Sequence, residues 1–94
     1  MKQQNKPKRQ LIFDQDALLV FAEQLKKLRH DVGITQTQLA FEAGISLSQV
    51  ARIETARINP TLSTVFAIAR ALDIPLSTMF DFSLPINKTT NNFF

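Results

Sequence analysis

Two short polar runs on either side of an Ala-Gly pair constrain the fold of this chain more than any other feature. The runs are "TQTQ" (residues 35–38) and "SLSQ" (residues 46–49), and each opens on a hydroxyl residue with Gln three places later. This is the pattern of a capping box, in which the hydroxyl accepts from the backbone N–H three residues on and the Gln side chain reaches back. Both runs therefore predict the start of a helix. The first helix is short and stops at Gly44, so the turn between the two helices contains only a few residues.

Apolar side chains recur at helical spacing before and after this pair of helices. An earlier helix begins after Asp14 or Asp16, either of which can cap it, and ends at Gly33. Its apolar face is Leu18, Phe21, Leu25 and Leu28. A later helix begins after Thr61, and its stripe is Leu62, Val65, Ile68, Ala69 and Leu72. A short fifth helix over "PLSTMF" begins at Pro75. The sequence thus predicts an all-α domain of five helices.

The helix that follows Ser46 has two distinct faces. Val50 and Ile53 point inward with the helical period, and the opposite side carries side chains with no predicted structural role. That outer face is Leu47, Ser48, Ala51, Arg52 and Thr55.

Composition excludes most catalytic and metal chemistry. The chain has 94 residues, no Cys and one His, which predicts a single domain without a disulfide, a thiol nucleophile or a multi-His metal site. We expect His30 to be solvated, and we expect no enzymatic activity and no cofactor. Asp14 and Asp16 interrupt the apolar run after the basic N-terminus, which argues against a signal peptide. No apolar run approaches a membrane span, and we expect a cytoplasmic protein.

The basic charge is concentrated at the N-terminus. Residues 1–13 carry Lys2, Lys6, Lys8 and Arg9 without an acid, while the rest of the chain is nearly neutral. We interpret residues 1–13 as a basic flexible arm, which either follows DNA or serves only for solubility. Residues 14–80 are the predicted helical domain. Residues 81–94 are either a frayed tail or a patch that packs on the body or on a second subunit.

Two long segments of the sequence resemble a known family. "LKKLRHDVGITQTQLAFEAGISLSQVARIE" and "NPTLSTVFAIARALDIPLSTMF" are similar to the phage-repressor and Cro-like regulators, the xenobiotic-response-element (XRE) family with a lambda-repressor-like fold. The resemblance covers about residues 18–80. It departs at Ala56 and Asp73, where the family usually has Gly. Because both positions favour positive φ, each is expected to carry some strain.

The resemblance implies sequence-specific binding of double-stranded DNA, with the third helix in the major groove and the second across the backbone. It implies a transcriptional regulator, a repressor that binds an inverted repeat as a homodimer. The dimer surface would include the fifth helix and the residues after it: Met79, Phe80, Phe82 and Leu84. The alternative is an antitoxin-like or adaptor module of the same fold that binds a partner protein.

Candidate DNA contacts follow from the resemblance and from the chemistry of the outer face. Gln36 matches a phosphate-contacting Gln, and Arg52 can make a bidentate pair with guanine. Gln49 either reads a base or caps the helix through Ser46. The full candidate set is Gln36, Ser46, Leu47, Ser48, Gln49, Ala51, Arg52, Thr55, Arg57 and Asn59.

The remaining roles divide by side-chain type. Leu47 and Ala51 suit a thymine methyl group, whereas Thr55, Arg57 and Asn59 lie where they could reach phosphates.

Arg29 and Glu54 correspond to a paired Arg and Glu in many family members. The resemblance assigns them a structural ion pair that links the first helix to the end of the third.

Overall fold

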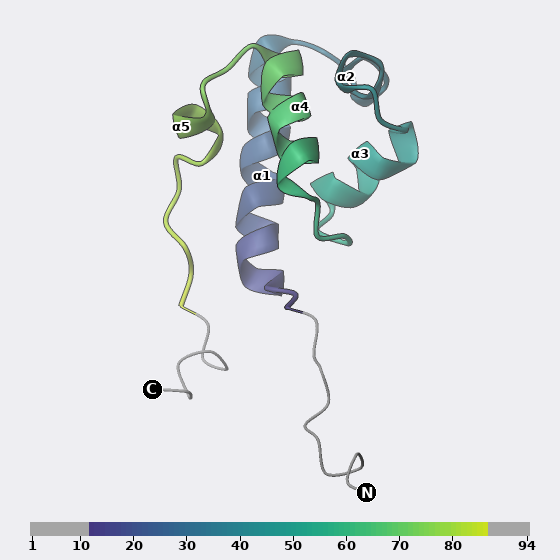
Figure 1. Ribbon diagram of the computed structural model, residues 1–94. Helices are drawn as coiled ribbons and strands as arrows, with labels where there is room; N and C mark the ends of the chain where they lie inside the picture. The colour runs from purple at the N-terminus through teal and green to yellow at the C-terminus, as the bar shows by residue number, and fades with distance from the viewer. Residues whose placement is uncertain (1–11, 87–94) are drawn as a thin grey trace, which may run out of the picture.

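Five α-helices make up the computed structural model, which describes residues 12–86 and contains no strand within that range (Figure 1). The helices are α1 (Gln15–Val32), α2 (Gln36–Ala43), α3 (Leu47–Glu54), α4 (Leu62–Leu72) and α5 (Leu76–Met79). The prediction of a five-helix, all-α fold is therefore confirmed. Residues 1–11 and 87–94, which include most of the predicted arm and tail, lie outside the described residues.

The helix ends follow the capping chemistry of the sequence. Asp14, rather than Asp16, caps α1, because its Oδ1 accepts from the backbone N–H of Ala17 at 3.1 Å. Thr61 caps α4 in the same way through the N–H of Thr64. At the other end of α4 the chain turns through Asp73 at φ 55°, and after α3 it turns through Ala56 at φ 58°. Both left-handed positions expected from the missing glycines are thus confirmed.

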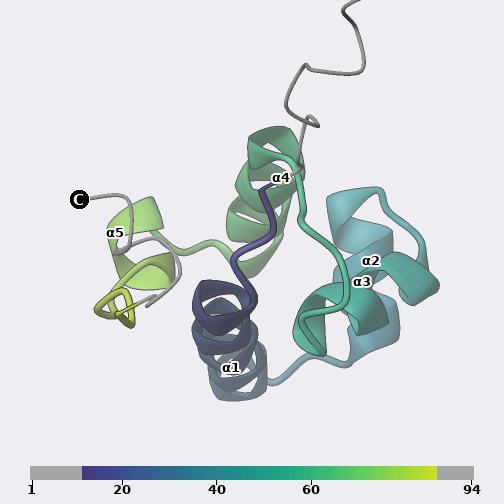
Figure 2. The ribbon, with the colours of Figure 1, turned by 90° about the horizontal axis from the view of Figure 1, so that it is seen from below.

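α1 and α4 lie side by side at the centre of the molecule, with α2 and α3 on one flank and α5 on the other (Figures 1 and 2). Each helix contributes to one buried core, as the periodicity predicts. Its largest members are Phe21, Leu25 and Leu28 of α1, Leu39 of α2, Val50 and Ile53 of α3, Val65, Ile68 and Leu72 of α4, and Met79 of α5.

Two predicted positions are wrong. Leu62 was expected in the apolar stripe of α4, but it is 66% exposed. It begins the first turn of the helix and lines an open apolar groove with Phe21, Phe80 and Phe82, so no further layer covers it. Met79 was expected on a dimer surface, but it is completely buried. The short helix α5 turns that side chain inward against the core, so Met79 cannot contact a second subunit.

The chain after α5 packs partly on the body. Phe82 is half-buried against the core, and its ring lies 6.4 Å from that of Phe21 and 6.2 Å from that of Phe80, centroid to centroid. Phe21 and Phe80 are themselves stacked at 5.7 Å. The alternating residues Phe82, Leu84 and Ile86 form no strand, because no neighbouring strand is present in the described part of the chain to pair with them.

No helix among residues 12–86 is both long and apolar enough to cross a membrane.

Candidate nucleic-acid interface

The turn between α2 and α3 is fixed by backbone hydrogen bonds. At the start of α2 the capping box is complete: Thr35 Oγ1 accepts from the N–H of Gln38 at 3.0 Å, and the Gln38 side chain accepts from the N–H of Thr35 at 2.8 Å. Gly44 ends α2 at φ 73°, a left-handed conformation that suits glycine. The N–H of Ile45 then donates to Ala40 O at 3.0 Å, so the two helices meet at a defined angle.

The start of α3 is capped more simply than the sequence predicts. Ser46 Oγ accepts from the N–H of Gln49 at 3.0 Å, but the Gln49 side chain makes no reciprocal bond to the Ser46 backbone. The second capping box is therefore only half formed. The hydroxyl already satisfies the N–H of Gln49, and the half-buried Gln49 side chain has no hydrogen-bond partner within residues 12–86.

The outer face of α3 is largely exposed. Leu47 is 48% exposed, Ser48 and Arg52 are exposed, and Ala51 is half-buried. The guanidinium of Arg52 has no ion pair or hydrogen bond with any residue that the structure describes. The opposite face carries the buried Val50, Ile53 and Glu54. Arg52 is thus the one charged side chain that α3 presents to its surroundings.

A buried ion pair fixes the other end of α3. Arg29 Nε donates to Glu54 Oε2 at 2.7 Å, and Arg29 Nη2 donates to Glu54 Oε1 at 3.0 Å. Arg29 Nη1 also donates to Ile34 O, in the turn before α2, at 3.0 Å. Both side chains are buried. The structure thus forms the pair that the resemblance assigns, as a bidentate contact from α1 to the last residue of α3.

Gln36 joins the same network. Its Nε2 donates to Glu54 Oε1 at 2.8 Å, so the carboxylate accepts three hydrogen bonds from side chains of two other helices. Sequence reasoning treated Gln36 only as a phosphate contact and missed this bond. Glu54 connects α1, α2 and α3 at a single buried group, and the network fixes the orientation of α3 relative to the two other helices.

The loop after α3 contains three candidates for phosphate contact, and two of them have internal partners. Thr55 Oγ1 donates to Ala51 O at 2.8 Å, and Asn59 Nδ2 donates to Ile12 O at 3.2 Å. Arg57 is exposed and makes no side-chain contact of this kind with the described residues. The sequence offers no signal for the Asn59 bond, because the two residues lie 47 positions apart.

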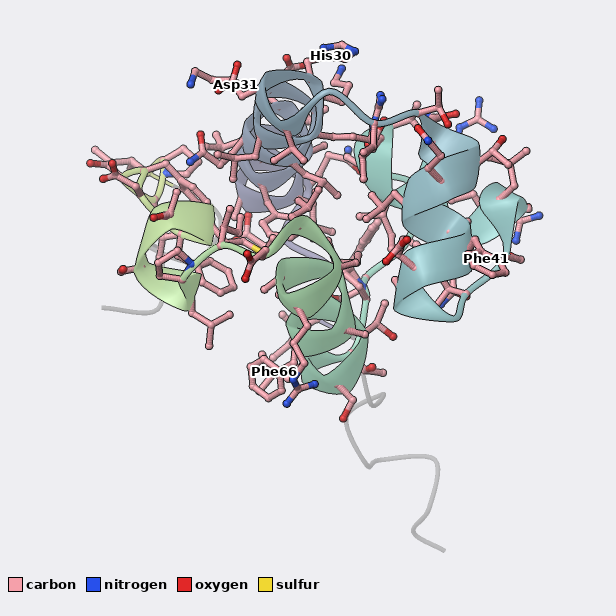
Figure 3. The ribbon with its side chains drawn as sticks, turned by 90° about the horizontal axis from the view of Figure 1, so that it is seen from above. His30, Asp31, Phe41 and Phe66 are labelled. Atoms are coloured by element: carbon pink, nitrogen blue, oxygen red, sulfur yellow. The ribbon has the colours of Figure 1, made fainter. Side chains whose placement is uncertain are left out.

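A shallow depression lies where the end of α1 meets the starts of α2 and α3. Its lining includes His30, Thr35, Gln36 and Leu47. The first backbone N–H groups of α2 have no intrahelical acceptors, and such groups favour anions. Figure 3 shows His30 at the end of α1, whereas Phe41 lies on the side of α2 away from α1.

Comparison with protein families and curated relatives gives one consistent result. A helix-turn-helix family matches residues 25–79. The immunity repressor protein of Bacillus phage phi105 is 41% identical over 61 residues, which is 65% of this chain and 42% of the repressor. The HTH-type transcriptional regulator SutR of Escherichia coli is 37% identical over 54 residues, or 57% of this chain and 30% of SutR. The chain therefore matches less than half the length of either relative.

Solved structures share the helical arrangement. The restriction-modification controller protein C.AhdI of Aeromonas hydrophila superposes with a TM-score of 0.65 at 35% identity, over 67% of this chain and 96% of the controller. A hypothetical transcription factor from Neisseria matches 95% of this chain and 98% of its own length with a TM-score of 0.65, and its 24% identity supports the fold alone.

Proposed function

Because this chain belongs to the helix-turn-helix family of transcriptional regulators, we propose that it binds double-stranded DNA in a sequence-specific manner through α3. The observation that carries the proposal is the contrast between the two sides of α3. Its outer face is largely exposed and carries Arg52, whose guanidinium has no partner within residues 12–86, while its inner face is fixed by the core and by Glu54. A major groove about 12 Å wide admits one such helix.

Base recognition in this proposal is assigned by side-chain chemistry. Arg52 donates both guanidinium nitrogens to guanine O6 and N7. Ser48 and Gln49, in the first turn of α3, read polar base edges, with Ser46 beside them. Leu47 and Ala51 contact thymine methyl groups. The Gln49 side chain forms no reciprocal cap to Ser46 in the described structure, which supports its place in this set.

Backbone contacts complete the proposed interface. The N-terminal N–H groups of α2 suit a phosphate, with Gln36 beside them, and Arg57 is available on the loop after α3. Thr55 flanks that loop. The helical body is nearly neutral, so most of the cationic charge for phosphate comes from Lys2, Lys6, Lys8 and Arg9.

We propose that the protein acts as a homodimeric repressor on an inverted repeat. Relatives named as repressor and transcriptional regulator support this role. A single helix-turn-helix buries little surface on DNA, and such modules commonly pair to read two half-sites. Phe80 and Leu84 are exposed beside the apolar groove and supply surface for such pairing, together with the predicted tail 81–94. DNA binding would place the protein in the cytoplasm, and no residue is assigned a catalytic role.

One observation favours the alternative, an antitoxin-like or adaptor module. Phe41 is 84% exposed on α2, where it contributes nothing to the core (Figure 3). An apolar contact of this kind suits a partner protein. Salt separates the two functions, because DNA binding weakens steeply as salt rises while an apolar contact does not.

The proposed function is tested by selection of bound duplexes from a random pool with the full chain. Enrichment of an inverted repeat supports specific binding and dimeric recognition together. Enrichment of a single unrepeated site supports DNA binding but contradicts the dimer. No enrichment at low salt overturns the proposal.

A further inference from the structure

Two long-range hydrogen bonds connect the start of the described chain to the loop after α3. Asn59 Nδ2 donates to Ile12 O at 3.2 Å, and Gln15 Nε2 donates to Ala56 O at 3.3 Å. In both bonds a side-chain amide donates to a main-chain carbonyl. The bonds therefore constrain the path of the backbone at the root of the N-terminal arm, where residues 1–11 join the body.

Backbone hydrogen bonds connect the loop after α3 to the end of that helix. The N–H of Arg57 donates to Arg52 O at 2.8 Å, and the N–H of Ala56 donates to Ile53 O at 3.1 Å. Ala56 is buried in its left-handed conformation, so the carbonyl that Gln15 contacts is fixed. These backbone bonds hold the loop in place relative to the end of α3. A segment that is hydrogen-bonded to the loop is therefore also held in place relative to α3.

The root of the arm lies where the proposed DNA surface ends. Figures 1 and 2 show the start of α1 beside the loop between α3 and α4, on which the exposed Arg57 lies. An extended chain spans at most about 3.3–3.6 Å per residue, so a segment of ten residues before Ile12 can reach at most about 36 Å. That reach equals about one turn of duplex, 34–36 Å.

We propose that Asn59, assisted by Gln15, is a positioning residue that directs the basic arm onto the DNA that α3 reads, and that Asn59 does not itself contact a phosphate. The proposal rests on the proposed function. Its physical basis is preorganisation: Ile12 is fixed to the loop before DNA arrives, so less conformational freedom is lost when the lysines of the arm meet phosphates. It differs from the assignment of Asn59 by sequence alone, which gave it a phosphate.

A four-protein cycle tests this role. Wild type, Asn59→Ala, a deletion of residues 1–10, and the combination are titrated with the selected duplex and with a scrambled duplex of equal length, at two salt concentrations. We expect Asn59→Ala to weaken binding to both duplexes about threefold in the full chain and less than 1.5-fold in the deleted chain. The buried core of the described structure lies within residues 21–79, and Asn59 is exposed, so all four proteins should fold.

A measurement without DNA separates failure of this proposal from failure of the proposed function, and a control variant tests whether the effect is specific to Asn59. Backbone ¹⁵N relaxation of Ile12 and Phe13 in the DNA-free protein should show greater motion in Asn59→Ala than in wild type, and unchanged relaxation overturns the anchor. Arg57→Ala, on the same loop, is the matched control, and it should weaken binding equally in the full and deleted chains.

The binding data have equally definite outcomes. An Asn59→Ala loss of the same size in full and deleted chains makes Asn59 a phosphate contact and overturns the positioning role. No loss in the full chain overturns it as well. A wild-type chain that binds neither duplex overturns the proposed function and the role of the anchor in it, whereas the relaxation data still report on the anchor.

Discussion

The two ends of α3 are built differently. Its N-terminal end has one side-chain cap, the hydroxyl of Ser46, and is followed by exposed residues. Its C-terminal end is fixed by the buried Glu54 carboxylate, which accepts three hydrogen bonds from α1 and α2. A helix that is anchored at one end can present the other end to a ligand without losing its orientation. The difference teaches that one buried group at the last residue can orient a helix of eight residues whose outer face stays largely exposed.

Breaking the anchored end should have the largest effect. Arg29→Ala and Glu54→Ala each leave a buried charge without its partner, so each should lower the free energy of unfolding by about 3–5 kcal/mol. Replacing both residues with apolar side chains of similar size should cost less than either single change. Urea unfolding measures all three variants. Single variants that unfold at the wild-type urea concentration would show that the pair does not fix α3.

Gln36→Met tests the third bond to the same carboxylate. It keeps the length of the side chain and removes the hydrogen bond to Glu54, and bonds to charged groups contribute about 1.5–3 kcal/mol. We expect a loss of stability at the lower end of that range, because Arg29 still contacts Glu54. Gln38→Met, which removes only the exposed capping bond to Thr35, is the control and should cost less. Equal losses of stability in the two variants would show that the bond from Gln36 to Glu54 does not help to fix the C-terminal end of α3.

Arg52→Ala tests the presented face. If Arg52 reads a guanine, the substitution should weaken binding to the selected duplex by about 1–3 kcal/mol and binding to scrambled duplex much less. Stability should change little, because the side chain is exposed and unpaired in the described structure. Equal weakening on both duplexes would instead make Arg52 a phosphate contact.

Ser46→Ala should have the smallest effect of the four. Loss of an N-cap hydroxyl typically costs about 1 kcal/mol. Ser48→Ala, two residues later on the exposed face, is the matched control, because its hydroxyl forms no hydrogen bond within residues 12–86. Thermal unfolding in parallel measures both. If Ser46→Ala lowers stability as much as Glu54→Ala does, the two ends of α3 do not differ in their contribution to stability.

Local chemistry explains why so much of the fold could be predicted. Caps such as Thr35 and Thr61, the glycine stops and the apolar period depend on residues within one or two turns, so the sequence contains them. Ala56 and Asp73 could be placed in the left-handed region through the family resemblance, because the family usually has Gly at both positions. The spacing of apolar residues does not show whether another helix packs on each of them. This explains why Leu62 is exposed and Met79 is buried, against the prediction.

The candidate site was less predictable because its fixing contacts are non-local. Gln36 and Glu54 are 18 residues apart, and Asn59 and Ile12 are 47 apart, so each contact exists only once the helices have packed. Both donors are uncharged amides, whose sequence context resembles that of any surface Gln or Asn. The Arg29 and Glu54 pair could be found only through the family resemblance. The DNA contacts themselves stay predictions.

The shared carboxylate of Glu54 also has a consequence for the kinetics of folding. Its donors come from α1 and α2, so the network is complete only after three helices have docked. Interactions that form only after the rate-limiting step accelerate unfolding when they are lost and leave the folding rate nearly unchanged. We therefore expect the network to set the lifetime of the folded chain. Gln36→Met should leave the folding rate nearly unchanged and should shorten the half-life of the native state.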